Sequence, residues 1–165
     1  MFIQVESLEM TKKLAEKLAQ VVTENDVILL NGDLGAGKTT FSQYFGKALG
    51  VKRTINSPTF NIIKSYKGRL PFHHMDCYRL ENSDEDLGFD EYFNSDAVTL
   101  IEWSEYIADF LPEERLEINI KYIEENKRLF EIIPKGEHYK QIKEVLDDDN
   151  IINWYFKSTV SRITC

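Results

Sequence analysis

The residues Gly32-Asp33-Leu34-Gly35-Ala36-Gly37-Lys38-Thr39 stand between a short apolar run, Val27 to Leu30, and an amphipathic segment over residues 38 to 48. The apolar run is typical of a strand that is buried on both faces. The segment after the loop carries its apolar side chains on one side and is followed by Gly50, which favours a helix that ends there. The quoted stretch is therefore predicted to be a loop that joins a buried strand to a helix.

This loop matches G-x-x-x-x-G-K-[ST], the spacing of a phosphate-binding P-loop. Its glycines, Gly32, Gly35 and Gly37, permit backbone angles at which successive N–H groups turn inward around phosphate oxygens. The helix that begins near Lys38 adds its N-terminal dipole to the same anion site. Lys38 is expected to reach the β- and γ-phosphates of a nucleotide, and the Thr39 hydroxyl to bind Mg²⁺. A chance match has a probability on the order of one in a hundred at the usual glycine frequency, so the sequence predicts a nucleotide-binding protein.

Two carboxylates are candidates for metal binding or catalysis beside the loop. A P-loop requires an acidic residue to hold the magnesium ion. Glu102 ends the apolar run Val98-Thr99-Leu100-Ile101 and suits that role, although it could simply mark where a strand reaches the surface. Asp76 lies among polar residues on another predicted strand, where it could orient the attacking water or contact water bound to the metal. The candidate catalytic residues are Lys38, Asp76 and Glu102, with the alternative that Asp76 is one of the polar side chains common on the faces of strands.

Two further residues are weaker candidates. Thr59 lies in the loop after the first P-loop helix, a region in which switch-type NTPases place a hydroxyl that senses the γ-phosphate or its metal. The alternative is that Thr59 is an ordinary turn residue. Trp103 follows Glu102 directly and could line a nucleotide or partner site, but an aromatic residue beside a strand end is more often part of the core.

The rest of the chain predicts an α/β fold, a P-loop NTPase-like three-layer sandwich with a mixed, mainly parallel central sheet carrying antiparallel hairpins. Ser7 is the expected N-cap of a first helix. The other expected elements are helices over residues 8 to 23, 106 to 111 and 137 to 148, a strand from Val98 to Trp103, and hairpins that pair Phe60–Tyr66 with Leu70–Tyr78 and Leu116–Ile123 with Arg128–Ile133. Residues 1 to 149 are expected to form one domain, followed by a tail, residues 150 to 165, of unknown role.

Composition is that of an ordinary soluble globular protein. The chain has 165 residues, 42% of them hydrophobic and 29% charged, and no run of eighteen apolar residues, so no membrane-spanning helix is expected. The first residues lack the pattern of a secretory signal. Cys77 and Cys165 are far apart without metal-ligand spacing, which favours reduced thiols and a cytoplasmic location.

The net charge of −8 argues against tight autonomous binding to nucleic acid, which usually needs a basic face. An acidic total does not exclude a local basic patch, and it leaves room for a protein partner. The Asn-Lys-x-Asp pattern that reads guanine in GTPases is missing, since Asn126-Lys127 is followed by Arg128 and Leu129. ATP is therefore favoured over GTP.

Four motifs in order resemble the bacterial TsaE (YjeE) family, over about residues 5 to 135. They are Gly32 to Phe41, Ser57-Pro58-Thr59-Phe60, His74-x-Asp76-x-Tyr78-Arg79 and Ile101-Glu102-Trp103, with a further similar block from Leu87 to Phe93. The resemblance implies an ATPase required to make threonylcarbamoyladenosine, the modified base beside the anticodon in tRNAs that read codons starting with A. It implies action with the TsaD transferase and its partner TsaB, multiple turnovers supported by ATP hydrolysis, tRNA contacted only indirectly or weakly, and no membrane.

Carried over by position, the resemblance assigns a role to each matching residue. The expected ATP-phosphate ligands are Gly35, Ala36, Gly37, Lys38, Thr39 and Thr40, with Thr39 and Glu102 on Mg²⁺ and Asp76 assisting hydrolysis. Thr11 resembles a family position near the nucleotide base, and a helix-surface threonine is an equal alternative. Tyr78, Arg79 and Trp103 match positions that are either catalytic or at the partner surface. The tail from Asn150 to Cys165 matches nothing associated with the family.

Two other functions remain open at this point. A small-molecule P-loop kinase would need a second substrate pocket and usually an Arg-bearing lid. The Arg residues of this chain are scattered, although Arg69 and Arg79 could approach the site. A nucleotide-controlled binding module would differ from an ATPase mainly in turnover.

Overall fold

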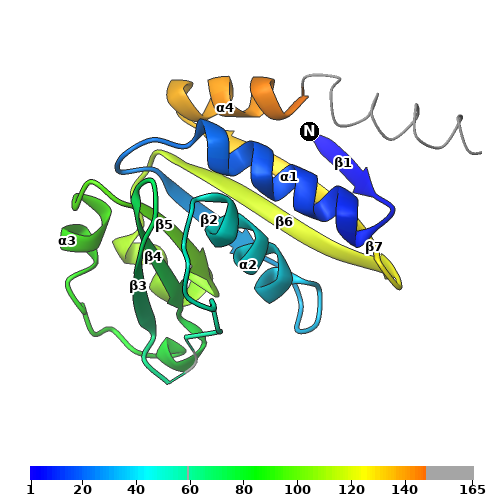
Figure 1. The fold of residues 1–165 in the computed structure, drawn as a ribbon. Helices are drawn as coiled ribbons and strands as arrows, with labels where there is room; N and C mark the ends of the chain where they lie inside the picture. The colour runs from blue at the N-terminus through cyan, green and yellow to red at the C-terminus, as the bar shows by residue number, and fades with distance from the viewer. Residues whose placement is uncertain (59, 148–165) are drawn as a thin grey trace, which may run out of the picture.

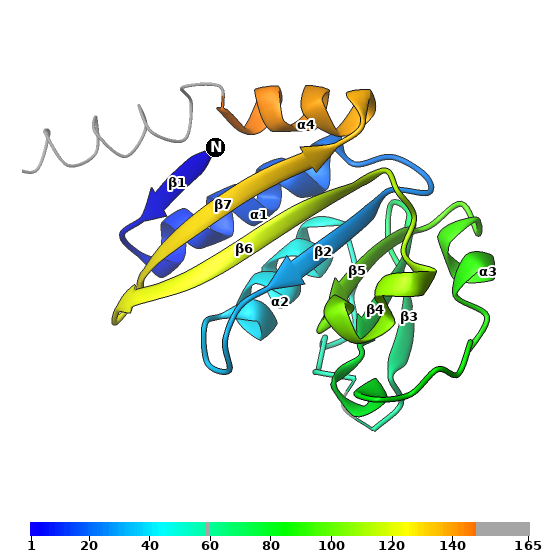
Figure 2. The ribbon, with the colours of Figure 1, turned by 180° about the vertical axis from the view of Figure 1, so that it is seen from behind.

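The computed structural model describes residues 1–58 and 60–147 of the chain. Seven strands form one sheet in the order β1-β7-β6-β2-β5-β4-β3 (Figures 1 and 2). The strands are β1 (Phe2–Val5), β2 (Val27–Asn31), β3 (Ile63–Lys67), β4 (Pro71–Asp76), β5 (Val98–Glu102), β6 (Arg115–Glu124) and β7 (Lys127–Lys135). The helices are α1 (Leu8–Val21), α2 (Lys38–Ala48), α3 (Phe89–Phe93) and α4 (Glu137–Asp147), with two 3₁₀ segments, η1 (Tyr78–Leu80) and η2 (Ser104–Phe110).

The middle of the sheet is parallel and its edges are hairpins. Strands β6, β2, β5 and β4 run parallel to one another. Antiparallel pairing adds β3 to β4 at one edge, and β7 and β1 beyond β6 at the other. Val27 to Leu30 of β2 and all five residues of β5 are buried, as expected for strands covered on both faces. The predicted α/β class, with a parallel core and antiparallel hairpins, is confirmed.

Helices cover the two faces of the sheet unequally. Helices α1 and α2 pack side by side on one face, and α4 packs against β7 and α1 (Figure 1). Phe41 and Phe45 of α2 are fully buried in the core on this side. On the opposite face α3, η1 and η2 lie over the β5–β4 half (Figure 2). The strands that carry the predicted site residues therefore lie in the covered middle of the molecule.

Most predicted helix boundaries are confirmed within two residues. Ser7 caps α1, since its Oγ accepts a hydrogen bond from Met10 N at 3.1 Å. Helix α2 spans the predicted residues 38 to 48. Strand β1 was not predicted, because its four residues are too few to show a period of two; it forms by pairing with β7.

Three predicted strand ends are wrong. The strand placed over Phe60 to Tyr66 begins only at Ile63, because Asn61 N and Ile62 N both donate to Pro58 O and Ile62 has a φ of 61°. Strand β4 ends at Asp76 rather than Tyr78, because Tyr78 N donates to Asp76 Oδ1 as the chain turns into η1. Trp103 leaves β5 with a φ of 56°. All three differences lie where the chain turns around the candidate site.

Arg69 does not approach the predicted site. Its Nη2 donates to Ala19 O at 2.7 Å and Val22 O at 3.0 Å, so it satisfies carbonyls at the end of α1. The predicted tail, residues 150 to 165, lies outside the described residues. No helix in the described part of the chain is long and apolar enough to cross a membrane.

Candidate nucleotide-binding site

The predicted site residues meet at the carboxyl ends of three parallel strands. The glycine-rich loop follows β2, Glu102 ends β5 and Asp76 ends β4. In the sheet register Glu102 is paired with Leu30 on one side and with Asp76 on the other. Ligands of open α/β sheets bind outside these strand ends, so the sheet brings both carboxylates to the loop.

The loop has the backbone of an anion cradle. Gly35 and Gly37 adopt φ values of +81° and +110°, a region that favours glycine. A Cβ atom at Gly32 would lie 2.7 Å from Ile120 O, so the loop packs closely on β6. Gly37 is the N-cap of α2 and offers no side-chain hydrogen bond. The first amides of α2 therefore have no side-chain cap, as an anion site at a helix N-terminus requires.

Lys38 is buried and held by two contacts. Its Nζ donates to Gly32 O at 2.7 Å and lies 3.9 Å from the centroid of the Trp103 ring. The Trp103 ring is in turn stacked on Tyr106, at 5.9 Å and 4°, and meets the Tyr78 ring edge-on at 5.0 Å. Trp103 thus contacts the P-loop lysine from an aromatic cluster beside the loop.

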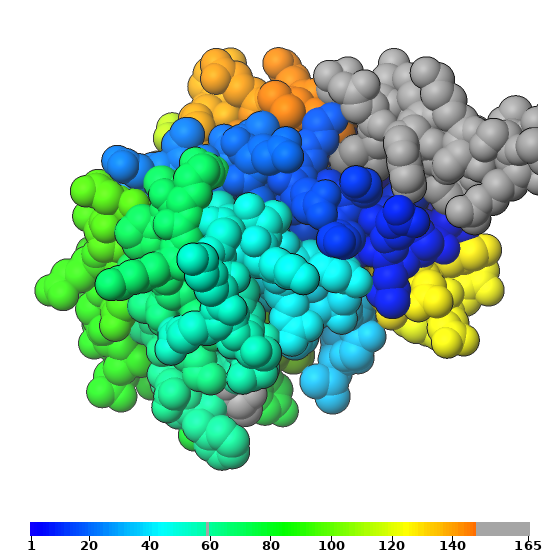
Figure 3. All heavy atoms as spheres, viewed as in Figure 1, coloured from blue at the N-terminus to red at the C-terminus, as the bar shows by residue number. Residues whose placement is uncertain are grey.

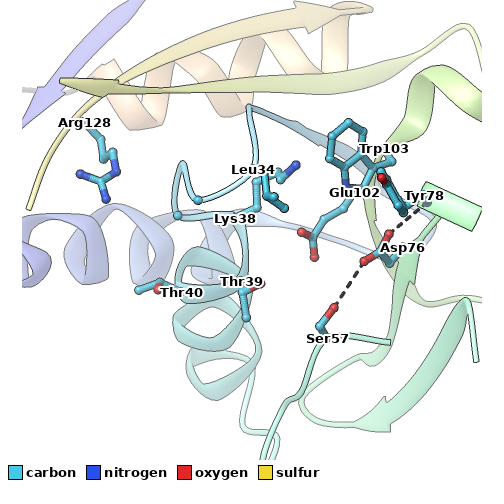
Figure 4. A pocket seen from close by; sticks show the side chains of 12 residues that line it. Leu34, Lys38, Thr39, Thr40, Ser57, Asp76, Tyr78, Glu102, Trp103 and Arg128 are labelled. Atoms are coloured by element: carbon cyan, nitrogen blue, oxygen red, sulfur yellow. Dashed lines mark hydrogen bonds between the residues drawn. The ribbon is translucent and has the colours of Figure 1, made fainter. Parts of the chain in front are cut away.

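A pocket of about 540 Å³ opens at this place (Figure 4). It brings together most of the predicted residues, which come from the loop, α2 and the ends of β4 and β5. The lining consists of Leu34, Gly35, Gly37, Lys38, Thr39, Thr40, Ser57, Asp76, Tyr78, Glu102, Trp103 and Arg128. The volume is within the usual range of small-molecule sites.

Glu102 is fixed by a buried histidine. His74 Nε2 lies 2.6 Å from Glu102 Oε2, and the two residues are 0% and 3% exposed. With its proton on Nε2, His74 donates to this carboxylate and leaves Nδ1 without a partner among the described residues. The Glu102 carboxylate points into the pocket (Figure 4). His74 was quoted from the sequence only as part of a motif, and the contact with Glu102 follows from the β4–β5 pairing.

The oxygen donors fit a magnesium ion that is bound together with a nucleotide. Thr39 and Glu102 both line the pocket and supply a hydroxyl and a carboxylate, the hard oxygen ligands that Mg²⁺ prefers. The described residues contain no group of three or more His, Cys, Asp or Glu side chains that could hold a metal alone. Mg²⁺ commonly takes one or two protein oxygens and completes its shell with phosphate and water, which agrees with this small donor set.

Asp76 is held at both carboxylate oxygens. Ser57 Oγ donates to Oδ2 at 3.3 Å, and Tyr78 N donates to Oδ1 at 3.1 Å (Figure 4). Ser57 comes from the loop after α2 and was not predicted as a site residue. Thr59, the predicted switch residue, lies outside the described residues.

Arg128 was also missed. It stands near the start of β7, and its Nε donates to Ala36 O at 2.6 Å. Its Nη1 donates to the carbonyls of Glu124 and Lys127, each at 2.9 Å. Arg128 is 92 residues from Ala36 in sequence, and only the adjacency of β6 to β2 brings the β6–β7 hairpin over the loop. No local sequence pattern signals this contact.

Three of the predicted residues that the structure describes do not line the pocket. Ala36 is buried, and its N donates to Asp33 O at 3.0 Å. Thr11 is buried in α1, and its Oγ1 donates to Ser7 O at 3.3 Å. Arg79 is exposed and its guanidinium lies 4.8 Å from the centroid of the Phe60 ring. The role of Thr11 near the nucleotide base, and the catalytic or partner-surface role of Arg79, remain predictions.

Cys77, next to Asp76, is unsuited to nucleophilic chemistry. The side chain is fully buried and not in a disulfide. Burial, reinforced by the charges of Asp76 and Glu105, raises the pKa of its thiol to about 12. The thiolate is the reactive form, so Cys77 stays protonated and inert at neutral pH.

We expect His74→Leu to weaken the magnesium dependence of nucleotide binding, because Glu102 would lose the donor that fixes its carboxylate. The free energy of unfolding should fall by about 1–3 kcal/mol, since a buried carboxylate is left without its partner. His74→Gln, which places an amide N–H near the Nε2 position, should restore part of both properties. Fluorescent-nucleotide titrations at graded Mg²⁺ and urea unfolding measure the two effects.

His73→Leu is the matched control, because His73 is the neighbouring histidine and bonds instead to Ser65 and Ser95. An unchanged Mg²⁺ midpoint in His74→Leu would contradict the positioning role.

Comparison with known proteins shows the family to which the chain is similar. Residues 5–130 match the family model described as "Threonylcarbamoyl adenosine biosynthesis protein TsaE". The chain is 48% identical over 147 residues to the "tRNA threonylcarbamoyladenosine biosynthesis protein TsaE" of Bacillus subtilis, covering 88% of this chain and 93% of that protein. It is 43% identical over 145 residues to the protein of the same name from Rickettsia conorii, covering 86% and 82%. The crystal structure of Bacillus subtilis YdiB superposes with a TM-score of 0.79 at 38% identity, over 91% of this chain and 95% of that one.

Proposed function

Because this chain belongs to the TsaE family of threonylcarbamoyl adenosine biosynthesis proteins, we propose that it is a Mg²⁺-dependent ATPase that serves the threonylcarbamoyl modification of tRNA. The observation that carries the proposal is the convergence of a complete P-loop with Glu102, which ends the neighbouring parallel strand β5, and Asp76, which ends the next parallel strand β4. A phosphate cradle, a metal ligand and a second carboxylate are the parts that phosphoryl transfer to water requires.

The loop and the start of α2 bind the nucleotide phosphates. The backbone amides of the loop and of the first turn of α2, together with the helix dipole, favour the negative charge of the α- and β-phosphates. Lys38 exchanges its bond to Gly32 O for the β- and γ-phosphate oxygens. Since Lys38 is only 7% exposed, its charge acts there with little screening by water.

Thr39 and Glu102 would hold the magnesium ion, which would neutralise charge on the phosphate oxygens. The hydrogen bond from His74 keeps the Glu102 carboxylate in one orientation before the nucleotide arrives. A ligand held in place in advance has little orientational freedom left to lose on binding. The Glu102 carboxylate is thus ready for the metal.

Asp76 orients the attacking water. Its two oxygens accept hydrogen bonds from Ser57 Oγ and Tyr78 N, so the carboxylate is fixed and its remaining lone pairs can accept from a water molecule in the pocket. Asp76 and Glu102 are neighbours in register. The attacking water and the metal ion on the phosphate would therefore be contacted from two adjacent strand ends, those of β4 and β5.

Intrinsic hydrolysis is expected to be slow. Arg128 is the arginine of the described residues that lines the pocket, and three of its hydrogen bonds go to backbone carbonyls. It therefore positions the P-loop rather than the transferring phosphate. In related P-loop enzymes an arginine or similar group supplied in trans adds about 10³ to 10⁵ in rate. TsaD and TsaB are the proposed partners that complete the site.

The test is magnesium-dependent ATP hydrolysis by the purified protein, with and without TsaB and TsaD. We expect slow hydrolysis by the protein alone and stimulation of at least about tenfold by the pair, as an in-trans group would give. Fast hydrolysis that ignores both partners would contradict the proposal. In that case the small-molecule kinase alternative is tested by a screen of metabolites as phosphate acceptors, read out by mass.

A further inference from the structure

Charge is divided sharply along this acidic chain. Residues 34 to 75 contain seven Lys and Arg and no Asp or Glu, so all 28 acidic residues lie outside this segment. The segment folds as one continuous part of the molecule, from the P-loop through α2 to β3 and β4. On the face seen in Figure 3 its cyan and green atoms form a continuous surface. The net charge of −8 therefore conceals a locally basic region.

Some of these basic side chains form hydrogen bonds with other parts of the protein. Lys38 lies in the P-loop, and Arg69 bonds to carbonyls at the end of α1. Arg53 is exposed, with one N–H donated to Ser65 O at 3.0 Å and its guanidinium 4.9 Å from the centroid of the Tyr66 ring. This contact holds the Arg53 plane in place while leaving other N–H groups outward.

Three exposed lysines surround Arg53. Lys47 stands in the last turn of α2, Lys52 follows that helix, and Lys67 ends the edge strand β3. None of the three forms an ion pair with a described residue. A carboxylate neighbour would normally be expected for a surface lysine in so acidic a chain. Their charge is therefore available to a ligand.

These cations line two adjoining hollows. One, of about 540 Å³, is lined by Lys52, Arg53 and Lys67, together with the backbone of Gly50 and Gly68. The other, of about 370 Å³, is lined by Lys47, Lys52 and Arg53. No acidic side chain lines either one. We call Lys47, Lys52, Arg53 and Lys67 the basic surface.

The composition of the basic surface fits a nucleic-acid backbone better than a protein partner. Protein interfaces are depleted of Lys and are anchored by buried aromatic or aliphatic residues. The large apolar side chains that are exposed among the described residues all lie elsewhere: Phe2, Leu8, Leu34, Phe60, Tyr78, Tyr122, Ile123 and Val145. Phosphodiester groups, in contrast, are bound by Lys and Arg through release of counterions.

We infer that the basic surface binds the phosphodiester backbone of RNA, without reading its sequence. This inference rests on the charge and exposure of these residues and does not depend on the proposed ATPase activity. Binding by the isolated protein is weak, since a nonspecific contact with few phosphates has a Kd of roughly 10⁻⁴ to 10⁻⁶ M. RNA would therefore be held firmly only together with another contact.

The basic surface is distinct from the nucleotide pocket. The two share no lining residue. Thr39 and Thr40 begin α2 at the pocket and Lys47 lies in its last turn, about 10–12 Å along the helix axis at 1.5 Å per residue. RNA and a nucleotide can therefore be bound at the same time.

The experiment measures binding of a fluorescein-labelled, unmodified tRNA transcript to the full chain by fluorescence anisotropy between 25 and 200 mM KCl. The test variant is Lys47→Gln/Lys52→Gln/Lys67→Gln. The control is Lys12→Gln/Lys121→Gln/Lys140→Gln, which removes the same three charges from exposed lysines elsewhere. Both variants reach the same net charge, so only the location of the lost lysines differs.

We expect the test variant to bind at least about tenfold more weakly at the lowest salt and to lose about 2 to 3 from the slope of log K against log salt. The control should lose little. Equal losses of affinity in both variants would overturn the inference, because they would indicate that RNA binding depends only on the net charge of the protein. Loss of RNA binding in Lys38→Ala would also overturn it, since the RNA phosphate would then occupy the P-loop.

Two further measurements separate the alternatives. Poly-glutamate and an RNA duplex are compared as competitors of the labelled tRNA at equal total charge. If poly-glutamate displaces the tRNA equally well, the surface binds acidic proteins, which would contradict RNA binding. ATP hydrolysis without partners should be unchanged in the test variant. A failure of the RNA inference is thereby distinguished from a failure of the ATPase proposal.

Discussion

Replacing Lys38 with alanine is expected to reduce ATP hydrolysis by roughly 10²- to 10³-fold, the usual effect of losing a preorganised group that stabilises transition-state charge. The other cation that lines the pocket, Arg128, donates to the carbonyls of Ala36, Glu124 and Lys127, so we do not expect it to replace the charge of Lys38 on the β- and γ-phosphates. ATP affinity should fall as well. Steady-state hydrolysis and fluorescent-nucleotide binding measure the two effects.

The fold should survive this change. The Lys38 side chain makes its contacts with Gly32 O and the Trp103 ring, both at the pocket rather than in either apolar core. Thermal unfolding of Lys38→Ala should therefore stay close to that of Lys12→Ala, an exposed lysine on α1 that serves as the control. Normal hydrolysis in Lys38→Ala would refute the P-loop assignment.

Replacing Glu102 with glutamine is expected to remove most magnesium-dependent hydrolysis, by roughly 10²-fold or more, while metal-free nucleotide binding is largely kept. The substitution preserves the size of the side chain but removes the charge that would hold Mg²⁺. The amide can still accept a hydrogen bond from His74, so the buried contact is not simply broken. Titration of hydrolysis and of nucleotide binding with Mg²⁺ separates the two effects.

Glu105→Gln is the matched control, because Glu105 is an exposed carboxylate only three residues away, at the start of η2. It should hydrolyse ATP at the normal rate. If Glu102→Gln lost metal-free binding and hydrolysis to the same extent, Glu102 would be a structural residue rather than a metal ligand.

The parts of the fold that could be predicted are those that depend on local sequence. Helix α2 was predicted with its observed bounds, because the P-loop sets its start and Gly50, with a φ of +90°, marks its end. Strand β5 was recognisable because it is buried on both faces and therefore continuously apolar. The pairing of Asp76 with Glu102 in the sheet register was not predicted from the sequence.

The rest depends on contacts between distant segments. Arg128 reaches Ala36 only because β6 lies beside β2, and His74 finds Glu102 only through the pairing of β4 with β5. The strand predicted from Phe60 begins later, because Asn61 N and Ile62 N donate to Pro58 O in a turn. The residues of this turn show the same apolar pattern as a strand, so the sequence alone does not distinguish the two. A single sequence contains the residues of these contacts but no local signal for the pairing.

The contacts of Lys38 also bear on which anions the loop binds. To reach a phosphate, its ammonium group must give up the bond to Gly32 O and its place over the Trp103 ring. A net hydrogen bond is worth about 1 kcal/mol and a cation–π contact about 0.5–2 kcal/mol, so leaving both costs roughly a factor of 10 to 100 in affinity. A nucleotide recovers this cost through several phosphates and a metal ion, whereas a single inorganic phosphate does not. If the protein hydrolyses ATP as proposed, we therefore expect the loop to discriminate against lone phosphate ions, including the phosphate product, so that product inhibition by phosphate is slight.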